Sequence, residues 1–156
     1  MALIRRDIFY FAQRHGLYIN VGGHSFGTDD FQKKSFVDFY NEIRNQFPKM
    51  RKLDTWNNYD WSSDGCKNSV IMTELSREMA DWVAQGQETE GQRLMDLIER
   101  YFHEGDVPVT SIIYTDFLVT IMEAKKGTWD TIKKMMGTET ERHYKNLFNF
   151  YREIDT

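Results

Sequence analysis

Histidines and paired carboxylates are the side chains of this sequence that could act as metal ligands or as general acids and bases. The nearest approach to a ligand cluster is His103 and Glu104, followed by Asp106. At the end of a helix these three side chains point in different directions, which does not suit one shared metal ion. The spacing therefore predicts that His103 is a C-terminal helix residue favoured by the helix dipole. We expect His143 to lie on the polar surface of the last helix.

Sequence motifs of established catalytic chemistry are absent from the chain. There is no P-loop, dinucleotide fingerprint, H-E-x-x-H zinc motif, C-x-x-C pair or nucleophile elbow. The glycine-rich segment 22–27 lacks the lysine of a phosphate loop, and the charges of Asp29 and Asp30 after it would repel phosphate. Cys66 has no obvious His or Asn partner in the sequence, which is typical of an unreactive thiol. We therefore predict no catalytic residue, no cofactor and no metal site.

The long segment 49–67, between two expected helices, has the most distinctive local composition. Trp56, Tyr59 and Trp61 stand among Asn and Ser residues. Tryptophan and tyrosine are frequent at binding hot spots, and their mixture with Asn and Ser is typical of protein-recognition loops. The absence of Lys and Arg from residues 54–66 argues against stacking on single-stranded nucleic acid. The alternative is that one tryptophan folds down to cover the core.

A second candidate surface lies on the helix that follows. Glu74 and Glu78 are four residues apart on one helix face, where like charges cost about 0.2–0.5 kcal/mol. A cationic partner that covers this face would remove that cost. Acidic residues of the loop and of the helix would supply the complementary charge. The predicted partner-binding site consists of Trp56, Tyr59, Asp60, Trp61, Asp64, Glu74, Glu78 and Asp81.

Apolar residues recur at helical spacing along most of the chain, and glycines or prolines mark the ends of these segments. This pattern predicts helices over residues 3–15, 30–46, 69–84, 88–103, 106–125 and 128–136, and from 138 almost to the end. Residues 17–21 alternate like a strand and indicate one short extended segment. The expected fold is all-α, with about seven helices in an irregular bundle or short helical array. The 156 residues are expected to form a single domain, 1–156.

The net charge of −4 conceals an uneven distribution. Residues 1–52 carry a net +4, residues 53–123 a net −10 and residues 124–156 a net +2. The acidic middle disfavours nucleic acid and suits a basic protein partner, although a solvated acidic surface would give the same pattern. No apolar run approaches the roughly 18 residues of a membrane span, and no signal peptide is visible. With its single cysteine, the chain is expected to be soluble and cytoplasmic, with no membrane partner.

The order of elements from Met72 onward carries a resemblance. An acidic helix pair is followed by the apolar segment Val109–Leu118, by Met135-Met136-Gly137, and by the aromatic terminal segment Tyr144–Tyr151. This order resembles small helical bacterial proteins associated with polymorphic-toxin systems, several of which are thought to act as immunity proteins. The likeness covers about the last half of the chain. It implies a helical binding protein of bacterial origin and brings no catalytic residues with it.

These observations favour a non-enzymatic protein-binding module. The most specific expectation is an immunity or inhibitor protein that neutralises a basic partner, such as a toxin or effector, by occlusion. Two alternatives stay open. The chain could be a small enzyme with a polar site near His24, His103 or His143, or a structural or regulatory subunit that self-associates through its many aromatic residues.

Overall fold

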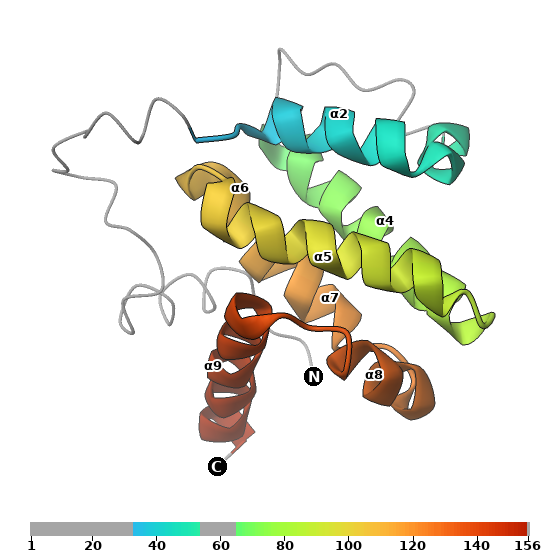
Figure 1. The fold of residues 1–156 in the computed structure, drawn as a ribbon. Coiled ribbons are helices and arrows are strands. Elements are labelled where there is room, and N and C mark those ends of the chain that lie inside the picture. The colour runs from blue at the N-terminus through green and yellow to red at the C-terminus, as the bar shows by residue number, and fades with distance from the viewer. Residues whose placement is uncertain (1–32, 54–64, 156) are drawn as a thin grey trace, which may run out of the picture.

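The regular elements of the chain are helices wherever the computed structural model describes it, over residues 33–53 and 65–155 (Figure 1). They are α2 (Phe36–Gln46), the 3₁₀ helix η2 (Pro48–Lys52), α4 (Gly65–Ala84), α5 (Glu88–Glu104), α6 (Val107–Ile112), the π-helical segment η3 (Ile113–Leu118), α7 (Val119–Ile121), α8 (Lys126–Lys133) and α9 (Thr138–Asp155). The one β-type pairing in these residues is an isolated parallel bridge between Lys34 and Gly105. The prediction of an all-α fold is confirmed. The expected helix 3–15 and the extended segment 17–21 lie outside the described residues.

Helix α2 begins later than the sequence pattern indicates. Its first residue is Phe36 rather than residue 30, because Ser35 and Asp38 form a capping box. The Ser35 hydroxyl accepts the Asp38 N–H at 3.3 Å, and the Asp38 carboxylate accepts the Ser35 N–H at 2.8 Å. At the other end, Pro48 lacks a backbone N–H and opens η2.

The predicted loop 49–67 is helical at both ends. Residues up to Lys52 belong to η2, and α4 begins at Gly65 rather than at Ser69. The expected buried face of α4 is confirmed, because Ile71, Leu75 and Met79 are all fully buried. The central part of the loop, residues 54–64, lies outside the described residues.

The expected helix 106–125 is one continuous segment with a widened middle. Asp106 caps it by accepting the Val109 N–H at 2.9 Å, and the helical backbone ends at Ile121 rather than at residue 125. Between Ile113 and Leu118 the backbone makes π-helical turns. Such turns are rare and are frequent at functional sites. The helix expected at 128–136 is α8, which starts two residues earlier and ends three residues earlier.

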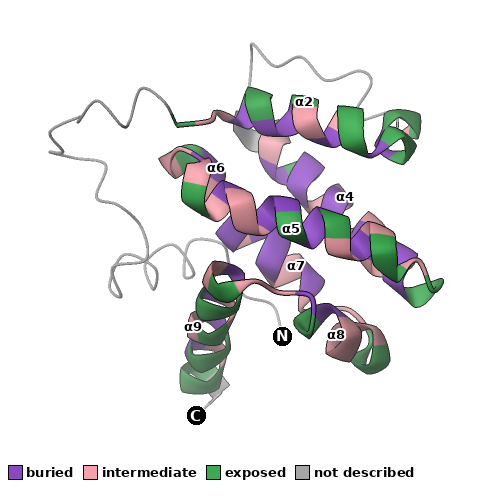
Figure 2. Ribbon diagram, in the orientation of Figure 1, coloured by how far each residue is buried: buried purple, intermediate pink, exposed green. Residues whose placement is uncertain are grey.

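The core surrounds α4, which contacts α5, η3, α7 and α8. Helix α2 lies across the upper end of this group, and α9 packs on α5 (Figure 1). Aromatic pairs tie α2 to its neighbours: the Phe39 and Tyr101 rings meet edge-on at 4.9 Å, and Phe47 stacks on Trp82 at 5.7 Å. Figure 2 shows that α4 presents buried surface along much of its length, whereas α9 is largely exposed. None of the described helices combines the length and the apolar character needed to cross a membrane.

Candidate functional site

Three predicted site residues form the acidic face of α4, which we define as Glu74, Glu78 and Asp81. Their spacing of four and three residues places them on one side of the helix. Glu78 is half-buried and Asp81 is exposed. Burial raises the pKa of Glu78, and the charges of Asp81 and Glu74 raise it further, while Lys49 on η2 acts in the opposite direction. The face is therefore a partly desolvated group of like charges.

The side chains of Glu78 and Asp81 make no hydrogen bond or salt bridge with other described residues. The cation beside them, Lys49, is directed to Gln87 and to the ring of Trp82, whose centre lies 5.6 Å from the ammonium nitrogen. Trp82 itself is buried and lies four residues, about one turn, after Glu78 on α4. Glu78 and Asp81 thus keep their negative charges available to an external cation.

The aromatic half of the predicted site lies outside the described residues. It comprises Trp56, Tyr59, Asp60, Trp61 and Asp64. The described chain resumes at Gly65, which begins α4. Since Glu74 is nine residues further along the same helix, the loop ends about 14 Å from the acidic face. That these residues act together is still a prediction.

The carboxylate of Glu42 has a structural role instead. It accepts a hydrogen bond from the Tyr101 hydroxyl at 2.8 Å and from Lys34 Nζ at 3.1 Å, and it pairs with Arg100. Burial favours the neutral acid, but the hydrogen bonds from Arg100, Tyr101 and Lys34 outweigh it and lower the pKa of Glu42. Arg100 also approaches Glu104, at 3.5 Å. This network fastens α2 and the segment before it to α5.

Glu99 on α5 is the N-terminal cap of α9. Its carboxylate accepts the backbone N–H groups of Glu139 and Thr140 at 2.8 Å each, and the Thr140 hydroxyl at 2.7 Å. Burial opposes ionisation, but these three hydrogen bonds together lower the pKa of Glu99. The carboxylate is therefore occupied by the first turn of α9, which otherwise has unpaired N–H groups.

The prediction that His143 is a surface residue is wrong. The side chain is only 7% exposed, stacks on Phe102 with 4.4 Å between ring centres, and meets Tyr114 edge-on at 5.4 Å. Burial lowers the pKa of His143 to about 4, and the positive charge of Arg142 adds to this effect. A neutral imidazole between two rings is a packing element of the α5–α9 contact.

His103 lies where the sequence pattern predicted, in the last turn of α5. Its Nε2 is 3.5 Å from a Glu99 carboxylate oxygen, and its side chain is exposed. Asp106 is the cap of α6 and points its carboxylate at Val109. Within the described residues, no three His, Cys, Asp or Glu side chains converge as ligands of a metal ion.

Sequence reasoning overlooked a buried polar contact between α4 and the π-helical segment. The Ser69 hydroxyl donates to Asp116 at 2.7 Å, and the Ser76 hydroxyl donates to the Phe117 carbonyl at 3.0 Å. Asp116 is only 4% exposed. An aspartate inside the apolar run 112–118 was the available signal, because a buried carboxylate needs hydrogen-bond donors.

The fold and the candidate site define an all-α protein with an acidic helix face. Comparison with protein families places the chain more closely: residues 40–153 match the family described as "Domain of unknown function (DUF7674)", and the chain belongs to that family. The match spans α2 from Tyr40 onward through nearly all of α9. No curated protein and no solved structure matches the chain.

Proposed function

We propose that the chain is a non-enzymatic protein-binding module that neutralises a basic partner protein by covering its functional surface. The acidic face of α4 carries this proposal. Two like charges at i and i+4 destabilise a helix, and partial burial of Glu78 adds to the cost. A cationic surface docked on Glu74, Glu78 and Asp81 relieves both effects, which is a source of binding energy and of fast association.

The contrast with the other half-buried carboxylates supports this assignment. Glu42 and Glu99 each accept at least three hydrogen bonds from within the chain, and these interactions join helices. Glu78 has no such partner among the described residues. Helix α4 is held on several sides by α5, α7 and α8, so its exposed face is rigid and little ordering accompanies binding.

The more specific form of this proposal is that the protein is an immunity or inhibitor protein acting in the bacterial cytoplasm. It is supported by the resemblance of residues 72–151 to immunity-type proteins and by the single cysteine, which suits a reducing compartment. The partner is then a toxin or effector with a basic surface. In this proposal Trp56, Tyr59 and Trp61, which precede α4 in the sequence, serve as the apolar anchors.

The test is affinity capture from a lysate of the source organism, with the purified chain and two variants as baits. In the first variant Glu74, Glu78 and Asp81 are all changed to Lys. In the second, a control with the same change in charge, three acidic residues outside α4 are changed to Lys: Glu123, Asp130 and Glu141.

We expect one basic protein to be retained by the wild type and by the control, and to be lost with the first variant or in about 0.5 M salt, where charges are screened. The activity of the captured protein should then fall on addition of one equivalent of the chain. Equal capture by both variants would contradict the role of the acidic face. Undiminished activity of the captured partner would contradict neutralisation.

A further inference from the structure

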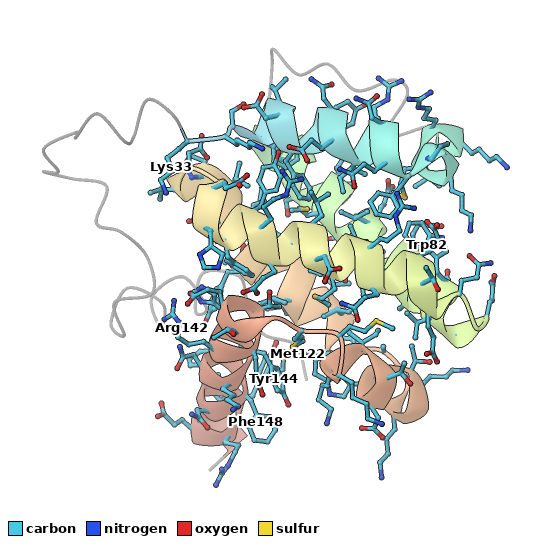
Figure 3. All side chains as sticks on the ribbon, in the orientation of Figure 1. Lys33, Trp82, Met122, Arg142, Tyr144 and Phe148 are labelled. Atoms are coloured by element: carbon cyan, nitrogen blue, oxygen red, sulfur yellow. The ribbon has the colours of Figure 1, made fainter. Side chains whose placement is uncertain are left out.

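A row of aromatic side chains runs along α8 and α9. We call it the aromatic ridge and define it as Trp129, Tyr144 and Phe148. The Trp129 and Tyr144 rings meet edge-on, with 5.2 Å between their centres. The centres of the Tyr144 and Phe148 rings are 6.1 Å apart. Tyr144 and Phe148 lie one below the other along α9 (Figure 3). Phe148 is 45% exposed, so the ridge ends in an open apolar contact site.

Both ends of the aromatic ridge carry a cation. Lys133 Nζ lies 5.8 Å from the centre of the Trp129 ring, and Arg152 lies 6.0 Å from that of Phe148. Lys133 has a weak ion pair with Asp130, at 3.4 Å. Arg152 has no carboxylate partner within the part of the chain that the structure describes. The ridge therefore combines apolar surface with one cation, Arg152, that has no carboxylate partner among the described residues.

The acidic face of α4 offers the complementary combination. Val70 lies one turn before Glu74 on the same side of the helix and is 47% exposed. This exposed apolar side chain is followed along the same side of α4 by Glu74, Glu78 and Asp81, which have the opposite charge to Lys133 and Arg152. Each of the two surfaces therefore has an exposed apolar side chain, and the charges near these side chains are of opposite sign.

The two surfaces point in different directions within one molecule. Val83 on α4 and Met135, two residues after α8, both border Gly91 on α5, within 2.7 and 3.4 Å of where its Cβ would lie, so Val83 is on the side of α4 toward this end of α8. Glu74 is nine residues from Val83, which places it about 180° around the helix. The acidic face therefore points away from α8.

We propose that the occupant of the aromatic ridge is a second copy of this chain, docked head-to-tail through its acidic face. A symmetric pairing of ridge with ridge, or of face with face, would place like charges together. A head-to-tail contact joins opposite charges and leaves one free ridge and one free face, so it can extend to further copies. The inference does not rest on the proposed function: a monomeric chain that captures a basic protein contradicts the self-association alone.

The test is sedimentation of the full chain at about 0.1 mM, where weak interfaces are populated. Wild type should exceed its monomer mass of 18.6 kDa in about 0.05 M salt and return to it in about 0.5 M salt. Phe148→Ser should weaken association about tenfold, by loss of a central aromatic contact. The matched control is Ile154→Ser, because Ile154 is exposed to a similar degree on the same helix.

Mixing two variants separates head-to-tail pairing from any symmetric dimer. A ridge variant, Phe148→Ser with Arg152→Ser, retains its acidic face. A face variant, Glu74→Gln with Glu78→Gln, retains its ridge. Each alone should be monomeric, and the mixture should give a 1:1 complex that does not grow further. Wild type that stays monomeric in low salt overturns the proposal, as does a mixture that stays monomeric.

Discussion

The imidazole of His143 on α9 stacks on the ring of Phe102 on α5, with 4.4 Å between their centres and 29° between their planes. Tyr114 closes the other side from the π-helical segment. Nδ1 of His143 is buried and has no hydrogen-bond partner within the described chain. The stack therefore holds the imidazole in its neutral form, since a charged ring there would lack compensation.

This stack makes the stability of the protein depend on pH. The pKa of His143 is about 4 in the folded chain against an ordinary 6.5, because burial lowers it. As the pH falls, His143 takes up a proton at a higher pH in the unfolded chain than in the folded chain. The contribution of the neutral imidazole to the free energy of unfolding is therefore complete above pH 6.5 and is lost as the pH falls from 6.5 toward 4. The full effect is up to about 3 kcal/mol. Urea unfolding at a series of pH values measures it, and His143→Phe should flatten the profile between pH 5 and 6.5.

A direct titration distinguishes this effect from general acid destabilisation. The groups that surround His143 include Glu99, Glu139 and Arg142, and the pKa values of both glutamates are lowered. The lowered pKa values place the titration of these two carboxylates below their ordinary range, so neither adds to the slope between pH 5 and 6.5. An NMR titration midpoint of His143 near 6.5 would show that the imidazole is not buried in solution.

Glu99→Gln should destabilise the junction of α5 and α9. The amide retains the shape of the side chain but loses the charge that receives the N–H groups of Glu139 and Thr140. Loss of a charged cap costs about 1–2 kcal/mol. Hydrogen exchange should accelerate in the first turn of α9. Asp96→Asn is the control, because Asp96 is exposed one turn earlier on α5 and, among the described residues, accepts only from Gln92. Equal effects of the two substitutions would contradict the capping role.

Two glycines should respond in opposite directions to substitution by alanine. A Cβ at Gly137 would lie 2.5 Å from Cδ of Glu99, whose carboxylate is held by three hydrogen bonds and cannot move aside. Gly137→Ala should cost about 1–3 kcal/mol. Gly127, inside α8, has open space around its Cβ position. Gly127→Ala should stabilise by about 0.4–1 kcal/mol. Melting temperatures that shift the same way would contradict this reading.

The helical faces could be predicted because each follows from spacing alone. Ile71, Leu75 and Met79 recur every four residues and are all buried. The same rule, applied fully, would have placed His143 correctly: it lies four residues before Leu147 and seven before Phe150, on the buried stripe of α9. The charges of neighbouring Glu139 and Glu141 suggested a polar surface instead.

Other features depend on contacts that spacing does not encode. The π-helical turn aligns Asp116 with Ser69, which is 47 residues away on another helix, and no local pattern indicates that register. The cap of α9 is likewise supplied by Glu99, about 40 residues earlier. Within the candidate site, the acidic face could be defined from the sequence alone, because all of its residues are on one helix. The ridge required α8 and α9 to be brought together.

The contact between Ser69 and Asp116 gives the last prediction. Asp116 is 4% exposed, and its two oxygens accept hydrogen bonds from Ser69 at 2.7 Å and from Thr115 at 3.1 Å. Ser69→Ala removes one donor from a buried carboxylate and should lower the free energy of unfolding by about 1–3 kcal/mol. Thr131→Ala is the control, because within the described parts of the chain the Thr131 hydroxyl bonds only to the Gly127 carbonyl, on the exposed surface of α8. If the Ser69 contact holds the π-helical turn in register, amide exchange over residues 113–118 should accelerate in Ser69→Ala alone. Unchanged exchange there would show that the turn forms without it.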